Sequence, residues 1–178
     1  RFFEEVLGWT HGVQFQMVAP QHTMALLIGG GTVHWFGQVP INATGMQQRG
    51  SKKGEQDIDE LFERTQSLRW LLIDEIEALA AIVFGILHGN LCKAMSRSPY
   101  AKRKDGTQRP FGGVNLSLSG DWWQLPPVKR IGFYSNPFQS DMDYTEQLAM
   151  SFFWRSSNDA IQGTHELVRS NRTSDIWL

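Results

Sequence analysis

The stretch Trp70-Leu-Leu-Ile-Asp-Glu75 decides the fold that this sequence predicts. Its first four residues form a run too short and too continuously apolar for an edge strand, so we expect a core strand buried on both faces. Two carboxylates then follow where the strand leaves the sheet. Apolar residues three or four positions apart predict one helix from Asp57 to Leu68, capped by Asp57 or Asp59, and another from Ile76 to Leu87.

Two further strands are predicted from alternating apolar and polar residues. Residues 13–17 alternate with glutamines before Val18-Ala-Pro20, and residues 114–119 alternate with Asn or Ser. Gly29-Gly-Gly31 predicts a sharp turn or a close approach of the backbone to a ligand. Strands that alternate with helices predict a mainly parallel sheet with helices on both faces, an α/β fold whose ligands bind beyond the carboxyl ends of the strands. Residues 132–159 show no helical or strand periodicity, so no secondary structure is predicted for them.

Composition narrows the class of protein. The chain has 178 residues, 17 basic against 18 acidic, and 41% hydrophobic residues, which indicates one globular domain rather than a disordered chain. The longest apolar run, Ala78 to Leu87, is shorter than the ~20 residues of a membrane-spanning helix. A single cysteine, Cys92, favours a soluble intracellular protein. Arg97 to Arg109 carries five basic residues and one acid, which predicts a solvated loop or a phosphate-contacting one.

The acid pair Asp74 and Glu75 has two interpretations. In phosphoryl transfer, one carboxylate can hold Mg²⁺ while a second orients or deprotonates an attacking water. A strand that ends in two acids can also simply enter a solvated loop, and the pair alone does not decide between the two interpretations.

A second polar and aromatic stretch, Gly120-Asp-Trp-Trp-Gln-Leu-Pro-Pro-Val128, follows the last predicted strand. Its proline pair restricts the backbone and removes two N–H donors. The Gln124 amide could donate to a terminal phosphate and lose that partner after hydrolysis. In the alternative interpretation, Trp122 and Trp123 belong to the core and Gln124 caps a turn.

This stretch resembles a motif of the Pif-type (petite integration frequency) DNA helicases, in the RecD-like branch of helicase superfamily one. Further stretches resemble that family in the same order: Val18-Ala-Pro20 followed by Gly31-Thr-Val-His34, Leu72-Ile-Asp-Glu75, Arg109-Pro-Phe-Gly-Gly-Val114, and Glu166-Leu167 followed by Arg172 and Asp175-Ile-Trp177. The resemblance implies a three-layer RecA-like domain of the P-loop NTPase fold. Residues 1–163 would be part of the first motor domain, without its N-terminal strand and phosphate loop, and residues 164–178 the start of the second.

The resemblance also implies roles for individual residues. Asp74 would bind Mg²⁺, Glu75 would activate the hydrolytic water, and Gln124 would couple the γ-phosphate of ATP to the DNA-contacting loops. Arg172 would stabilise charge on the transferred phosphoryl group. The residues expected at the DNA are Gln21, His22, Thr32, His34, Trp35 and Pro126; aromatic stacking there would be worth ~1 to 3 kcal/mol per base.

The function implied is that of an ATP- and Mg²⁺-dependent helicase that moves 5′ to 3′ on single-stranded DNA and unwinds duplex DNA. Nucleus or mitochondrion, and DNA repair, recombination or telomere maintenance, are expected from the family alone. No Gly-Lys-Ser/Thr stretch occurs in the chain, so we expect the phosphate loop upstream of Arg1 and no activity from these residues alone. That absence also keeps open a non-catalytic remnant or DNA-binding scaffold; another P-loop NTPase is a third reading.

Four residues depart from the family pattern. Gln21-His22 stands in place of the usual Thr-Gly, Glu77 in place of a common serine, and Thr173 in place of the usual glutamine.

Overall fold

The structure is a computed structural model that describes residues 1–42, 52–136, 141–155 and 159–167, and only the backbone of residues 52–56. Its centre is a four-stranded sheet in the order β2-β1-β3-β4, and every strand pair is parallel. Ile73 pairs with Val18 on one side and with Leu118 on the other, so three strands end at the same level. The strands are β1 Phe15–Ala19, β2 Gly31–Thr32, β3 Trp70–Ile73 and β4 Asn115–Leu118.

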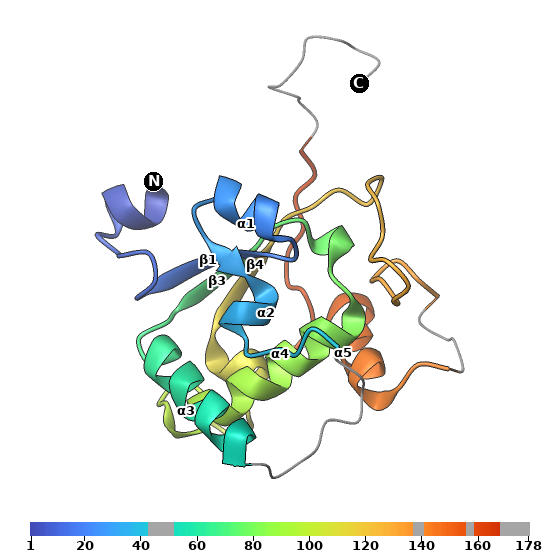
Figure 1. Ribbon diagram of the computed structural model, residues 1–178. Helices are drawn as coiled ribbons and strands as arrows, with labels where there is room; N and C mark the ends of the chain where they lie inside the picture. Colours follow the sequence, from blue (N-terminus) through green and yellow to red (C-terminus); the bar gives the residue numbers. More distant parts are fainter. Residues whose placement is uncertain (43–51, 137–140, 156–158, 168–178) are drawn as a thin grey trace.

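One face of this sheet carries the main core. Val18, Leu71 and Ile73 are fully buried there, and they belong to one hydrophobic cluster with the residues of α4. Helix α4 lies between α3 and α5 and packs against both (Figure 1). The helices are α1 His22–Leu27, α2 Val33–Phe36, α3 Lys52–Thr65, α4 Ala81–Ala94 and α5 Tyr144–Trp154.

The other face of the sheet is covered less completely by the described residues. A π-helical turn, Phe2–Val6, places Phe3 on Phe15 with ring centroids 5.0 Å apart and against Trp70 at 5.9 Å. Trp70 and Leu72 remain half-buried. The prediction that β3 is an interior strand with these bounds is confirmed, whereas full burial is found on one face only.

The first strand differs from its prediction. Alternation predicted a strand over residues 13–17 with its glutamines on one side, but β1 begins at Phe15 and continues to Ala19. Gln16 is buried, and its side-chain amide donates to the Met17 carbonyl oxygen at 2.8 Å. Gln16 pairs with Leu71 and lies on the same face as Val18, so it points toward the main core, where a polar side chain needs an internal partner.

Two predicted helices have shifted bounds, and α1, α2 and α5 were not predicted. Helix α3 begins at Lys52, so Asp57 and Asp59 lie inside it and cap nothing. The chain after β3 forms a 3₁₀ turn, Ile76–Ala78, before α4, which continues past Gly89 to Ala94. Helix α5 lies in the stretch without a readable period.

Short 3₁₀ turns, Met95–Arg97 and Pro110–Gly113, connect α4 to β4. Among the described residues, the structure contains no helix that is both long and apolar enough to cross a membrane.

Candidate functional site

The acid pair lies at the edge where three parallel strands end. The Asp74 backbone N–H donates to the Val18 carbonyl oxygen at 2.9 Å, which ties the pair to the end of β1. The Ile76 N–H donates to the Ser119 carbonyl oxygen at 3.0 Å, which ties it to the end of β4. Glu75 itself has φ 56° and ψ 47°, in the left-handed region that non-glycine residues rarely adopt. Such a conformation persists only where surrounding contacts hold it, and it is concentrated at functional sites.

Asp74 faces an oxygen from the neighbouring strand end. The Ser119 hydroxyl donates to Asp74 Oδ1 at 2.6 Å. A carboxylate and a hydroxyl are hard oxygen ligands of the kind that Mg²⁺ prefers. The described part of the chain holds no group of three or more His, Cys, Asp or Glu side chains placed for a metal ion. A magnesium ion at Asp74 would therefore need further oxygen ligands from water or from phosphates.

The glutamine loop, residues 120–128, leaves β4 and folds into a tight turn. Asp121 Oδ1 accepts from the Trp123 N–H at 2.9 Å, and the Asp121 carbonyl oxygen accepts from the Gln124 N–H at 3.0 Å. Trp123 is 97% exposed and Trp122 is 46% exposed. The interpretation of the two indoles as core residues is therefore wrong. The loop exposes its apolar residues instead of burying them.

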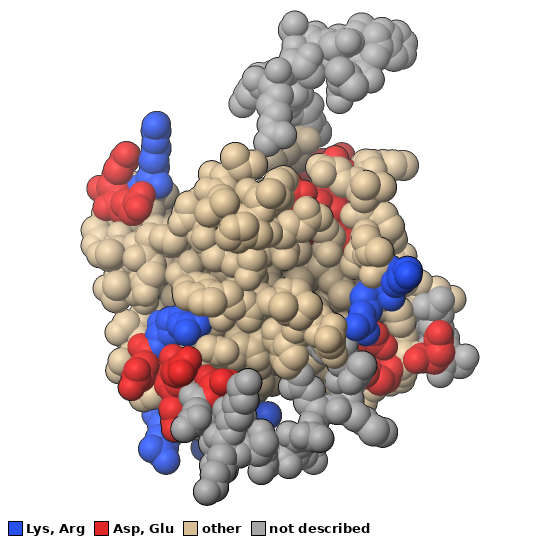
Figure 2. Space-filling model, in the orientation of Figure 1, with Lys and Arg blue, Asp and Glu red and all other residues tan. Residues whose placement is uncertain are grey.

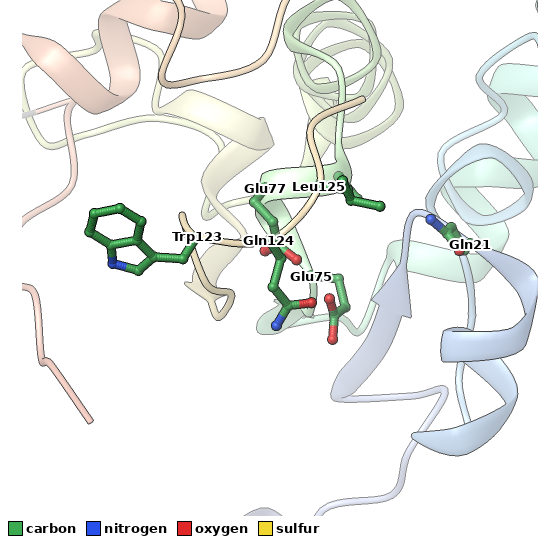
Figure 3. Close-up of a pocket in the computed structure, with 7 residues that line it drawn as sticks. Gln21, Glu75, Glu77, Trp123, Gln124 and Leu125 are labelled. Atoms are coloured by element: carbon green, nitrogen blue, oxygen red, sulfur yellow. The ribbon is translucent and has the colours of Figure 1, made fainter. Parts of the chain in front are cut away.

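Glu75 of the acid pair and the glutamine loop meet in a pocket of about 290 Å³, which Asp74 does not line. Figure 3 shows the Glu75 carboxylate and the Gln124 amide extending into the same space, while the Trp123 ring points away from them. Gln21 reaches the pocket from the segment that follows β1. Residues far apart in sequence thus converge as predicted for a parallel sheet. The lining residues are Gln21, Glu75, Glu77, Ala78, Trp123, Gln124 and Leu125.

The lining residue Glu77 was not predicted as part of the site. Glu77 is only 1% exposed, and its Oε2 accepts from the Asp121 N–H at 3.1 Å. Its sequence position gave a signal only as a departure from the usual serine. Burial of an acid two residues after Glu75 depends on the 3₁₀ turn that replaces the predicted helix start.

The residues expected at DNA fall into two groups. Gln21, His22 and Pro126 are exposed. Thr32 and His34 are half-buried, and the Thr32 hydroxyl accepts from the Trp35 N–H at 3.1 Å, so Thr32 caps α2. Burial lowers the pKa of His34 below its usual value. Their DNA-binding roles stay predictions.

Trp35 stands on the surface with a cation beside it. The ring is 57% exposed, which argues against a core role. The Arg64 guanidinium of α3 lies 4.5 Å from the ring centroid, and its Nη1 donates to the Trp35 carbonyl oxygen at 3.1 Å. A Cβ atom at Gly31 would lie 2.7 Å from the ring, so the glycine run permits a close approach to an indole rather than to a ligand. Sequence analysis did not find Arg64, because this pairing joins residues 29 positions apart.

Two other predicted features are the stretch 164–178 with Arg172 and the basic stretch 97–109. Arg172 and most of the stretch 164–178 lie outside the described residues. Glu166 and Leu167 are described and exposed. In the basic stretch, Lys102 and Lys104 are exposed and Arg103 forms an ion pair with Asp159, as expected of a solvated loop.

Charged side chains are unevenly distributed on the face shown in Figure 2. They gather over α3 and around the rim, and the central area over α1 and α2 is largely uncharged. Leu26 and Leu27 of α1 are 64% and 81% exposed. On this face, the segment that leads from β1 toward the pocket is therefore surrounded by uncharged rather than basic surface.

A parallel sheet with an acid pair and a glutamine loop at its carboxyl edge defines a RecA-like α/β domain. The fold class predicted from sequence is confirmed. The chain belongs to the PIF1-like helicase family, whose family model matches residues 12–172.

Individual relatives agree with this family. The chain is 30% identical to the human ATP-dependent DNA helicase PIF1 over 83% of its own length, and 32% identical to the Saccharomyces cerevisiae ATP-dependent DNA helicase RRM3 over 60%. It covers 22% and 13% of those proteins, so it spans about a fifth or less of their length. It superposes on the Pif1 helicase from Bacteroides in complex with ADP-AlF₃ and single-stranded DNA with a TM-score of 0.51. That match has 26% identity and covers 72% of this chain and 27% of the other.

Proposed function

We propose that this chain is part of an ATP-dependent DNA helicase that couples ATP hydrolysis to 5′ to 3′ movement on single-stranded DNA and to duplex unwinding. The observation that carries the proposal is the pocket where the Glu75 carboxylate and the Gln124 amide share one space at the carboxyl edge of a parallel sheet. Relatives named as ATP-dependent DNA helicases, and a solved relative that holds ADP-AlF₃ and single-stranded DNA, support the choice of nucleotide and polymer.

In this proposal, Glu75 accepts a proton from the attacking water or orients it toward the terminal phosphate. Glu75 lines the pocket, whereas Asp74 accepts from the Ser119 hydroxyl, so the two acids serve different partners. The Gln124 amide donates to the terminal phosphate and loses that partner after hydrolysis. A change in the glutamine loop then reports the state of the nucleotide. Arg172, outside the described residues, would stabilise charge on the transferred group.

Asp74 and the Ser119 hydroxyl fit a magnesium site because both offer oxygen ligands at the ends of two neighbouring strands, β3 and β4. Magnesium in phosphoryl-transfer sites is commonly held by one or two carboxylates together with substrate phosphates and water. When bound, the ion would neutralise phosphate charge during transfer. Asp74 would hold this ion at the end of β3.

The DNA would lie along the segments that begin at Gln21 and Thr32, with Trp35 offering its exposed ring to a base. Base stacking does not depend on sequence, as movement along DNA requires. Arg64 already lies against that ring. A base that stacks there would have to share the indole with the guanidinium or displace it.

The second motor domain of the same protein is the proposed partner across the pocket, with the division near residue 163. The nucleus or mitochondrion, and repair, recombination or telomere maintenance, are proposed on the family resemblance alone. A fluorescent fusion of the full-length protein tests the compartment. Unwinding of duplexes with a 5′ or a 3′ single-stranded tail tests the direction.

The central test is Glu75→Gln in the full-length protein that carries this chain. Loss of the base should lower DNA-stimulated ATP hydrolysis by about 10² to 10⁴-fold and leave ATP binding within about threefold, because general-base catalysis contributes at this scale. Glu63→Gln, at an exposed position on α3, is the matched control and should hydrolyse ATP normally. Wild-type turnover by Glu75→Gln would overturn the assignment.

A non-catalytic DNA-binding scaffold is the second candidate. It is favoured by one observation, the lack of a Gly-Lys-Ser/Thr stretch in these residues. It predicts that the full-length protein binds single-stranded DNA but neither binds nor hydrolyses ATP. Measuring both activities on the same preparation separates the two candidates.

A further inference from the structure

We infer that Glu77 is a positioning residue that holds the glutamine loop in register with the acid pair. The inference deepens the proposed function and rests on it for the catalytic consequence. The structural part of the inference, that Glu77 holds the loop in place, does not rest on the proposed function. Glu77 is not a member of the acid pair; it is buried and bonded to the glutamine loop.

The first observation is that the Glu77 side chain is buried away from water. The Glu77 side chain is buried, with 1% of its surface exposed. A buried carboxylate is unfavourable unless hydrogen bonds compensate for the lost hydration. The compensating bond comes from the glutamine loop, because the Asp121 N–H donates to Glu77 Oε2 at 3.1 Å. The loop and the carboxylate therefore depend on each other.

The second observation is that Asp121 organises the rest of the loop. Its side chain accepts from the Trp123 N–H and its carbonyl oxygen accepts from the Gln124 N–H. A displacement of the Asp121 backbone would carry both of these bonds with it. Glu77 thus acts on Gln124 through one residue, Asp121, and two hydrogen bonds.

The third observation concerns the residue before Asp121. A Cβ atom at Gly120 would lie 2.2 Å from Glu77 Oε2 and 2.9 Å from the Ile76 backbone nitrogen. The carboxylate therefore occupies the space that a side chain would need at Gly120. The close approach of this strand end to Glu77 requires glycine.

The fourth observation is that Glu77 stands on a backbone tied to the acid pair. It lies in the 3₁₀ turn Ile76–Ala78, which directly follows Glu75. The Ala78 N–H donates to the Glu75 carbonyl oxygen at 3.1 Å. The same short turn therefore sets the position of the proposed base and that of the carboxylate that holds the sensor loop.

The experiment compares Glu77→Ala, Glu77→Gln and Gly120→Ala in the full-length protein. In Glu77→Ala the Asp121 N–H loses its acceptor. Amide exchange in residues 121–124 should speed up about tenfold, and kcat of DNA-stimulated hydrolysis should fall about tenfold, the scale of one lost hydrogen bond to a charged group. The KM for ATP should change less than about threefold, because the misplaced sensor affects the reacting geometry more than ground-state binding.

Glu77→Gln keeps an oxygen acceptor at the same reach, so exchange and kcat should return to within about threefold of wild type. Gly120→Ala should reproduce the Glu77→Ala pattern while Glu77 is still present, and it serves if Glu77→Ala does not fold. Glu63→Ala removes an exposed carboxylate on α3 and should change neither readout.

Unchanged exchange in residues 121–124 of both Glu77→Ala and Gly120→Ala would overturn the inference. So would a Glu77→Gln protein as impaired as Glu77→Ala. If the wild-type protein does not hydrolyse ATP, the proposed function fails, yet the exchange data still decide whether Glu77 holds the loop.

Discussion

Two irregular segments flank β4, and both combine aromatic residues with glycine and proline. The turn Pro110–Gly113 precedes the strand and the glutamine loop, residues 120–128, follows it. Phe111 in the first is 3% exposed, whereas Trp123 in the second is 97% exposed. Similar composition therefore serves opposite purposes on the two sides of one strand.

The difference lies in what each segment contacts. The Phe111 ring lies 4.9 Å from Phe84, 4.9 Å from His88 and 5.2 Å from Phe152, between centroids, and the Phe111 N–H donates to His88 Nδ1 at 3.1 Å. The turn thus joins α4, α5 and β4. The glutamine loop faces the pocket instead. Two stretches that resemble the same family therefore divide into one that maintains the fold and one available for chemistry.

The largest expected effect is on the buried turn. Phe111→Ala should lower the free energy of unfolding by about 3 to 5 kcal/mol, because it leaves a cavity among three other rings. Urea unfolding followed by circular dichroism measures this change. Phe2→Ala, which removes a ring that is 61% exposed, is the control and should cost far less. A loss below about 1 kcal/mol at Phe111 would show that the turn is not part of the core.

A smaller effect is expected from pH at the same turn. Burial lowers the pKa of His88 to about 4, although the Asp159 charge acts in the opposite direction. The unfolded chain binds this proton near pH 6.5, so the stability contributed by neutral His88 is complete above that pH and is lost as pH falls through about 4. The loss is up to about 3 kcal/mol.

Comparing urea unfolding of wild type and His88→Gln between pH 7 and pH 4 isolates this contribution, because the other titrating groups are shared. The wild-type protein should lose more stability than the variant over this range. Parallel pH profiles would contradict a buried neutral histidine.

The smallest effect is expected at the exposed loop. Trp123→Ala should change the free energy of unfolding by less than about 0.5 kcal/mol, as is usual for surface positions without special contacts. The same urea titration measures it. A loss as large as that of Phe111→Ala would remove the contrast between the two segments.

The sequence predicted those parts of the fold that depend on local pattern. The continuous apolar run from Trp70 to Ile73 matches β3 to the residue, and a parallel sheet explains why Glu75 and Gln124 meet. Helix α5 was missed because its buried residues do not follow one stripe, although Asp143 and Glu146 form a capping box that was a readable signal.

The contacts that support the site could not be read from the sequence. The burial of Glu77 depends on where Gly120 and Asp121 return to the sheet. The contact of Arg64 with Trp35 depends on how α3 packs beside α2. Both are consequences of tertiary packing, and neither produces a pattern that can be recognised in the sequence.

The backbone bonds around the acid pair also have a mechanical consequence. The Asp74 N–H is bonded to Val18, two residues before Pro20, and the Ile76 N–H is bonded to Ser119. A load applied to the segment that carries Gln21 and His22 therefore reaches Asp74 through two residues and one hydrogen bond. Because these bonds join the three strand ends, we expect the strand ends to resist that load as one rigid unit.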